Sequence, residues 1–285
     1  EIDEIVDEDI WEEYAEKQQA FKHADNAALR KWISDLGSEN RMIKARAAQG
    51  LLHQGKTAIP LCLEAMFKAD DAKVIRLLAT IIHRIGKTGE LMFASAINHP
   101  PDDGALMNLL SVADVFHEST TVGDSIGTAI RNPNKEIQKA TIRTLTKFPV
   151  AAKCSAAITA LSSNNVEINA LGMYIIGVFR LRRLLSRLTE AISSENIKKG
   201  QSLALTITAI RALGCFDTES SIESLSNLVL ADNVGEIPDR IRLESLSTLA
   251  KIGSADSLET LHKVSGDSNH PDSNAVKALL QKIKK

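Results

Sequence analysis

The stretch Asp71-Ala-Lys-Val-Ile-Arg-Leu-Leu-Ala-Thr-Ile-Ile-His-Arg-Ile-Gly86 decides the fold of this chain. Its apolar residues follow the spacing of one helix face: Ile75, Leu78, Ala79, Ile82 and Ile85. Asp71 is placed to cap the start of the helix and Gly86 to end it. The stretch therefore predicts one amphipathic helix over 71–85.

The same pattern recurs at steps of 31 residues in both directions. The cap column reads Asn40, Asp71, Asp102, Pro133 and Asn164. The column four positions later reads Lys44, Ile75, Leu106, Ile137 and Ile168, and the next one reads Ala47, Leu78, Leu109, Ala140 and Leu171. The exit column reads Gly55, Gly86, His117, Phe148 and Phe179. Five units in one register indicate an internal repeat. Each unit predicts a helical hairpin, with second helices over 40–54, 71–85, 102–116, 134–147 and 164–179. Beyond Phe179 the spacing loosens, and we expect about eight hairpins in total.

The composition agrees with stacked helices. Of the 285 residues, 44% are hydrophobic, 25% are charged and only 4% are aromatic, as expected for thin aliphatic layers in a folded protein. Two helices of this length cannot bury their apolar faces alone, so neighbouring hairpins must cover them. We predict an all-α fold, a right-handed α-α superhelix or solenoid. No apolar run is long enough to span a bilayer.

The residues of the repeat resemble the HEAT-repeat family, an armadillo-type α-solenoid, in its short bacterial form. Asp71, Ile75, Arg76 and Ala79 with Ile85-Gly86 carry the resemblance, and Arg240-Ile241-Arg242 leading to Ile252-Gly253 is similar. Gln138 and Asn169 depart from it by replacing the family's Arg. The resemblance covers roughly residues 27–285 and implies that the second helices line a concave face. It is specific for fold and says little about function.

The N-terminal segment differs from the rest. Residues 1–16 hold nine acidic side chains and no basic one, and without them the formal net charge of −2 becomes +7. Trp11, Tyr14, Gln18 and Phe21 form one stripe of an amphipathic helix. We predict an acidic extension over 1–23, which caps the repeat domain at 24–285 or connects it to a missing upstream domain.

Two groups of cations are candidate partner-binding residues: Arg76, Lys139, Arg143 and Lys147, and Arg180 and Arg183 within the run Arg180, Arg182, Arg183, Arg187. Arginine grips carboxylates and phosphates through forked hydrogen bonds. The alternative for each group is a solvated helix face. For the arginine run this alternative rests on Leu181, Leu184, Leu185 and Leu188, which have the spacing of a core-facing stripe.

No catalytic, metal or cofactor motif stands out. The sequence has no HExxH, P-loop, GxGxxG or GxSxG. Its one His-Glu pair, His117-Glu118, falls short of the several pairs that hold two irons in deoxyhypusine hydroxylases, which are HEAT-repeat enzymes. The three cysteines, Cys62, Cys154 and Cys215, are far apart, and we expect buried thiols in a reducing, cytoplasmic compartment. The chain begins without a Met, so we expect its natural start to be absent.

These observations favour a scaffold that is not an enzyme, needs no cofactor and binds a protein or peptide on the concave face. Two alternatives stay open. The basic central repeats could bind an anionic polymer such as nucleic acid. The chain could also be an enzyme subunit of the HEAT-like lyase kind. A HEAT-like DNA glycosylase is disfavoured, because Trp11 and Trp32 both lie outside the basic zone.

Overall fold

The computed structural model of the chain describes residues 25–231 and 234–283. Within these ranges the regular structure consists of α-helices and short 3-10 turns, without a β-strand. The chain divides into two compact units, residues 1–152 and 153–285. The predicted all-α helical repeat is confirmed. The acidic extension predicted for residues 1–23 lies outside the described residues.

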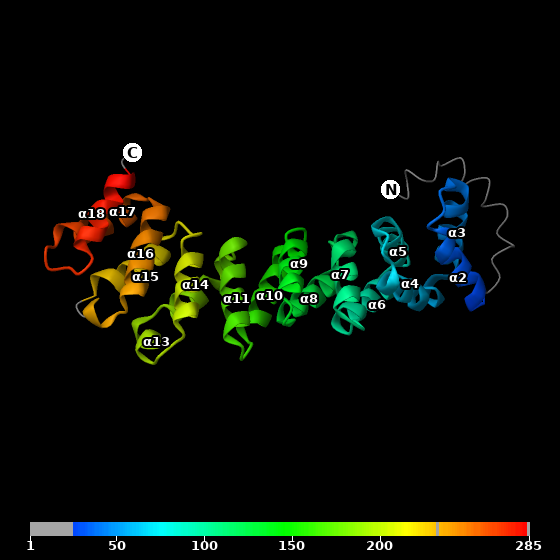
Figure 1. The fold of residues 1–285 in the computed structure, drawn as a ribbon, viewed down its shortest axis with the longest axis horizontal. Coiled ribbons are helices and arrows are strands. Elements are labelled where there is room, and N and C mark those ends of the chain that lie inside the picture. Colours follow the sequence, from blue (N-terminus) through cyan, green and yellow to red (C-terminus); the bar gives the residue numbers. More distant parts are fainter. Residues whose placement is uncertain (1–24, 232–233, 284–285) are drawn as a thin grey trace. The chain divides into compact units, whose positions relative to one another are not determined.

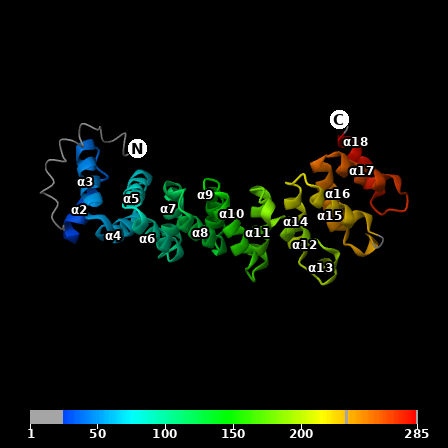
Figure 2. The same ribbon diagram turned by 180° about the vertical axis from the view of Figure 1, so that it is seen from behind.

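The first unit is built from hairpins whose helices alternate between two layers (Figure 1). The first helices are α2 (Asn26–Asp35), α4 (Ile59–Lys68), α6 (Lys87–Asn98) and α8 (Thr120–Thr128), and the second helices are α3 (Arg41–Gln54), α5 (Ala72–Arg84), α7 (Asp103–Val112) and α9 (Lys135–Leu145). Each second helix packs on the next one, as do α4, α6 and α8 in the other layer. Both views show α3, α5, α7 and α9 side by side (Figure 2).

The second unit continues the alternation with less regular lengths. Helix α10 (Val150–Leu161) runs across the boundary between the units. It is followed by α11 (Val166–Val178), α12 (Leu185–Ala191), α13 (Ser194–Lys198), α14 (Leu203–Leu213), α15 (Glu219–Leu230), α16 (Asp239–Ile252), α17 (Ala255–Gly266) and α18 (Ser273–Ile283). The second helices α11, α14 and α16 pack in series, and α12, α15 and α17 pack beside them. The short α13 is an insertion before α14, and it lengthens the repeat.

Polar caps fix where the second helices begin. The side chains of Asn40, Asp71 and Asp102 accept hydrogen bonds from the first turns of α3, α5 and α7, as predicted. The predictions for Pro133 and Asn164 are wrong by one residue, because Asn134 and Asn165 cap α9 and α11. Proline has no side-chain acceptor, whereas an asparagine amide oxygen binds the free N–H groups. The repeat therefore slips once, by one residue, between α7 and α9.

The apolar positions of the repeat follow the prediction in part. Ile75, Leu106, Ile137 and Ile168 are buried as the apolar column predicts. In α9, however, the next buried side chain is Thr141 rather than Ala140, which is half-buried. The Thr141 hydroxyl donates to the Ile137 carbonyl, so its polar group is satisfied inside the helix.

Among the described helices, none is both long and apolar enough to cross a membrane.

Candidate functional site

The predicted cations of the first unit lie on the second-helix layer, where they meet a carboxylate. Arg76 on α5 and Lys147 just after α9 both bind Asp114, which lies in the 3-10 turn that follows α7. The distances are 3.2 Å from Arg76 Nη1 to Oδ1 and 2.7 Å from Lys147 Nζ to Oδ2. Asp114 thus joins three successive hairpins.

The charge of Asp114 is stabilised by this arrangement. Partial burial by itself would raise the pKa of its carboxyl. The hydrogen bonds from Lys147 and Arg76 outweigh that effect and hold the pKa below its usual value. Asp114 is therefore ionised at neutral pH, and its single negative charge offsets one of the two positive charges of Arg76 and Lys147.

Beside Asp114 lies an open cavity of about 250 Å³ between α7 and α9. This α7–α9 groove is lined by Met107, Leu110, Ser111, Asp114, Ala140, Arg143, Thr144 and Lys147. Met107 is 38% exposed although its side chain is apolar. Within the described ranges the guanidinium of Arg143 makes no hydrogen bond or ion pair, and its charge acts at longer range on Glu136. The groove therefore offers an apolar wall beside an available guanidinium.

The second unit has a groove in the same place of the repeat. The α11–α14 groove is a cavity of about 300 Å³ lined by Tyr174, Gly177, Val178, Thr208, Arg211, Ala212 and Cys215. Arg143 and Arg211 each lie nine residues after the N-cap of their helix. Tyr174 and Val178 are 48% and 45% exposed and supply the apolar wall. Equivalent surfaces thus recur, one in each unit.

The arginine of the second groove is oriented by the next helix. Arg211 donates from Nε and Nη2 to the two carboxylate oxygens of Glu244 on α16, at 2.8 and 3.1 Å. The hydrogen bonds from Arg211 hold the pKa of Glu244 below its usual value although partial burial opposes this. A bidentate pair of this kind fixes the orientation of the guanidinium and also stabilises its charge.

The remaining predicted cations do not join the grooves. Lys139 binds Glu136 at 2.7 Å on its own helix. Arg180 follows α11 with φ of 49°, and Arg183 is exposed in the 3-10 turn Arg182–Leu184. The alternative that the arginine run forms the solvated side of one helix is wrong. Of the four arginines only Arg187 lies on an α-helix, because the chain turns before α12 begins.

The leucine stripe behind the arginine run is correspondingly incomplete. Leu181 and Leu188 are buried, whereas Leu184 and Leu185 are half-buried. The 3-10 turn changes the angle per residue, so the four side chains do not share one helix face. The α11–α14 groove could not be predicted from the sequence, because α11 carries apolar residues on all sides and the exposed Tyr174 and Val178 therefore resemble core residues.

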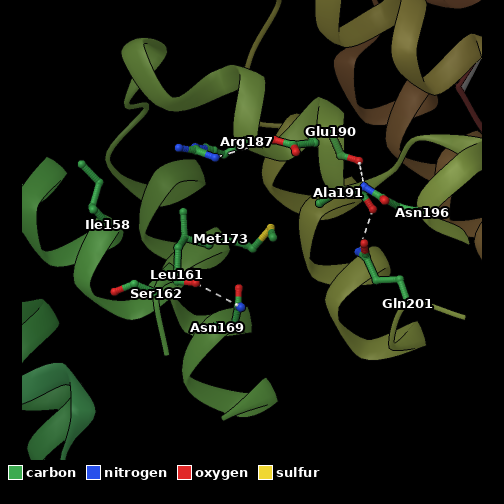
Figure 3. A pocket seen from close by; sticks show the side chains of 10 residues that line it. All are labelled: Ile158, Leu161, Ser162, Asn169, Met173, Arg187, Glu190, Ala191, Asn196 and Gln201. Carbon is green, nitrogen blue, oxygen red and sulfur yellow. Dashed lines mark hydrogen bonds and ion pairs between the residues drawn. The ribbon is translucent and has the colours of Figure 1, made fainter. Parts of the chain in front are cut away.

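A further cavity of about 350 Å³ lies among α10, α11, α12 and α13 (Figure 3). Three amides on its wall donate to carbonyls at helix ends: Asn169 to Leu161, Asn196 to Glu190 and Gln201 to Ala191. Figure 3 shows these bonds as dashed lines. Arg187 and Glu190 form a loose pair of 3.7 Å at the cavity. The amides close helix ends, which explains their presence without a ligand.

Nucleophiles and metal ligands do not gather at either groove. In the part of the chain that the structure describes, no three His, Cys, Asp or Glu side chains are placed to hold a metal ion. His117 and Glu118 are exposed and 3.8 Å apart. Cys62 is buried, and burial raises the pKa of its thiol to about 12. The prediction of a buried thiol is wrong for Cys215, which is exposed and lines the α11–α14 groove.

No family model matches the chain, and no curated protein matches its sequence. Among solved structures, human deoxyhypusine hydroxylase in complex with glycerol aligns at 13% identity with a TM-score of 0.36, over 90% of this chain and 96% of that one. An engineered protein aligns at 14% identity with a TM-score of 0.35, over 90% of this chain and 78% of that one. Both likenesses are too low to transfer a property to this chain.

Proposed function

We propose that this chain is a non-catalytic binding module that holds a protein or peptide against its second helices. The observation that carries the proposal is the repetition of one kind of groove, between α7 and α9 and between α11 and α14. Both grooves combine an exposed apolar wall with an arginine at the same helix position.

The chemistry of the grooves favours particular side chains. Met107 in one groove and Tyr174 with Val178 in the other are exposed enough to receive an aliphatic or aromatic anchor. Burying one such anchor contributes about 1.5–3 kcal/mol. Arg143 adds a partner for a carboxylate at the edge of its groove. We therefore propose a segment with apolar anchors flanked by acidic residues.

Nucleic acid fits these surfaces less well. Binding a phosphate backbone depends on several Lys or Arg side chains that are available to neutralise phosphates. Here Arg76 and Lys147 share Asp114, Lys139 binds Glu136 and Arg211 binds Glu244. A ligand with many phosphates would compete with each of these carboxylates.

A random peptide library displayed on phage and selected on the full chain tests the proposal. We expect selected peptides to combine one apolar anchor with flanking acidic residues. The double variant Met107→Asp, Arg143→Glu should lower the affinity for peptides that bind the α7–α9 groove about tenfold or more. It removes the exposed apolar side chain of the groove and reverses the charge at its edge. Titration of labelled peptides by fluorescence anisotropy measures the change.

The matched control is Leu91→Asp, which changes an exposed apolar residue of similar accessibility on the first helix α6. It should leave peptide affinity unchanged. If selected peptides bind both variants as they bind the unaltered chain, the second-helix grooves are not the binding surface. If instead single-stranded nucleic acid binds at low salt and is lost in Arg143→Glu, Arg183→Glu, the polymer alternative is correct.

A further inference from the structure

A cavity of the second unit gathers cations from two distant parts of the chain. It measures about 300 Å³ and lies where α11, α14 and α16 end, beside the start of α15. The ionisable and hydroxyl-bearing residues on its wall are Arg180, Arg182, Asp217, Thr218 and Lys251. Two of the three cations follow α11 and the third belongs to the last turn of α16, so only the fold brings them together. We call this space the cationic cavity.

The cations of this cavity are available to a ligand. In the part of the chain that the structure describes, the guanidinium groups of Arg180 and Arg182 and the ammonium group of Lys251 make no hydrogen bond or ion pair. The charge of Lys251 acts only at longer range, on Glu244. The exposed Asp217 supplies the single carboxylate on the wall. The wall therefore holds three positive charges and one negative charge, an excess of two.

Helix ends account for one of these cations but not for the group. Basic residues near a helix C-terminus interact favourably with the last carbonyls, and Lys251 in the last turn of α16 fits this pattern. Arg180 does not, because its φ of 49° lies in the left-handed region that glycine occupies without strain. Residues held in such conformations cluster at sites that bind ligands. The strained arginine and the unpaired charges thus coincide at one cavity.

A phosphate monoester suits this wall better than a carboxylate. It carries a charge of about −1.5 to −2 near neutral pH and has three oxygens that accept hydrogen bonds. The two guanidinium groups can each donate to pairs of these oxygens. The N-terminus of α15, whose N-cap Thr218 lines the cavity, adds a partial positive charge. A carboxylate would leave part of the cationic charge unbalanced.

We infer that the cationic cavity binds the phosphate group of a phosphate monoester. Arg180 and Arg182 donate hydrogen bonds to its oxygens, and Lys251 contributes the third positive charge. Two sources supply such a group, a free small molecule and a phosphorylated side chain of another protein. The cavity shares Cys215 with the α11–α14 groove. Its cations lie outside that groove, so this inference does not depend on the proposed function.

Titration of the full chain with O-phosphoserine tests the site. The amide signals of the protein are followed in two-dimensional NMR spectra. We expect saturable changes that are confined to residues 180–182, 214–218 and 251–253. Acetate at the same ionic strength should bind about tenfold more weakly, because it carries less charge and one oxygen fewer.

Two variants of the wall should lose affinity. Arg182→Gln, Lys251→Gln should weaken O-phosphoserine binding about tenfold or more, because two charged contacts are lost. Arg180→Gly should weaken the binding as well, although it relieves the backbone strain and raises the midpoint of urea unfolding. A residue with only a structural role would not lower affinity while raising stability.

The matched control removes two positive charges elsewhere in the second unit. Arg183 and Lys277 are exposed and do not line the cationic cavity. Arg183→Gln, Lys277→Gln should therefore bind O-phosphoserine as the unaltered chain does. Circular dichroism of each variant verifies that the helices are retained.

A short peptide distinguishes the two sources of phosphate. It holds one phosphoserine flanked by two alanines on each side. Tighter binding of the peptide than of O-phosphoserine would support a phosphorylated protein as the ligand. Weaker binding of the peptide would support a free small phosphate ester, and both outcomes agree with the site itself.

Three results would overturn the inference. Equal affinity for O-phosphoserine and acetate would show that the cavity does not recognise phosphate. Unchanged affinity in Arg182→Gln, Lys251→Gln would show that the phosphate binds elsewhere. An equal loss of affinity in the matched control would show that the total charge of the chain, and not this cavity, attracts the anion.

Discussion

At the scale of single residues, Arg180 occupies a backbone position that glycine fills elsewhere. Arg180 lies 15 residues after the N-cap of α11 and has φ of 49°. Gly55, Gly86 and Gly253 lie at the same distance after the N-caps of α3, α5 and α16, and all have positive φ. A side chain in this left-handed region costs about 1 kcal/mol. Arg180 is therefore a strained replacement for a helix-ending glycine.

Arg180→Gly should accordingly stabilise the second unit. The relief of strain exceeds the extra entropy of glycine in the unfolded chain, and we expect a gain of about 0.5–1 kcal/mol. Urea unfolding followed by circular dichroism measures it. Arg182→Gly is the matched control, since Arg182 lies in the adjacent 3-10 turn without positive φ and should lose stability. Equal losses in both variants would contradict the strain at Arg180.

At the scale of elements, the close approach of α11 and α14 depends on a glycine. A Cβ atom built on Gly177 would lie 2.8 Å from Ala212 Cα and 2.9 Å from Ala212 Cβ. The two backbones are thus too close for any side chain at this point. Gly177 also lines the α11–α14 groove, so the same contact sets the spacing of its two walls.

Gly177→Ala should force the two helices apart and destabilise the second unit by about 1–3 kcal/mol. It should also lower the affinity for peptides that bind the α11–α14 groove. Gly266→Ala provides the control, because Gly266 ends α17 with open space around its Cα and an added methyl there should be neutral or stabilising. Unfolding midpoints in urea distinguish the two, and unaltered stability of Gly177→Ala would refute the close approach.

At the scale of the whole molecule, a stack of hairpins distributes stability locally. Within each unit the described helices contact their neighbours, so damage in one region should spread only a short way. The buried ion pair in the last hairpins is a suitable place to observe this. Arg242 is 4% exposed and donates from Nε to Asp272 Oδ2 at 2.7 Å. That hydrogen bond raises the pKa of the Arg242 guanidinium, although burial opposes it.

Asp272→Asn should destabilise the region of α16 to α18 by about 3 kcal/mol, because a buried guanidinium loses its charged partner. The exposed Asp239, 2.9 Å from Arg242, retains part of the charge balance. Hydrogen exchange read by mass spectrometry should show faster exchange in α16 and α18 and unchanged protection in α5 and α7. Uniformly faster exchange over the whole chain would indicate one cooperative unit rather than a local stack.

The sequence by itself determined the helical repeat, because caps and apolar residues at fixed helical spacing act within one hairpin. Asn40, Asp71 and Asp102 could be assigned as N-caps from their side chains alone. The one-residue slip to Asn134 could not be predicted from a constant period, because the repeat pattern does not determine the length of the connecting loops.

Tertiary structure decided which cations are available. Arg76, Arg143 and Lys147 look alike in the sequence, yet Arg76 and Lys147 are held by Asp114 and Arg143 has no such partner in the described residues. The distinction depends on a carboxylate 33 and 38 residues away. The grooves likewise exist only once neighbouring helices are packed, because their walls belong to different hairpins. The sequence pattern shows which side chains of a helix can be buried. The packing of neighbouring helices determines which of its side chains stay exposed.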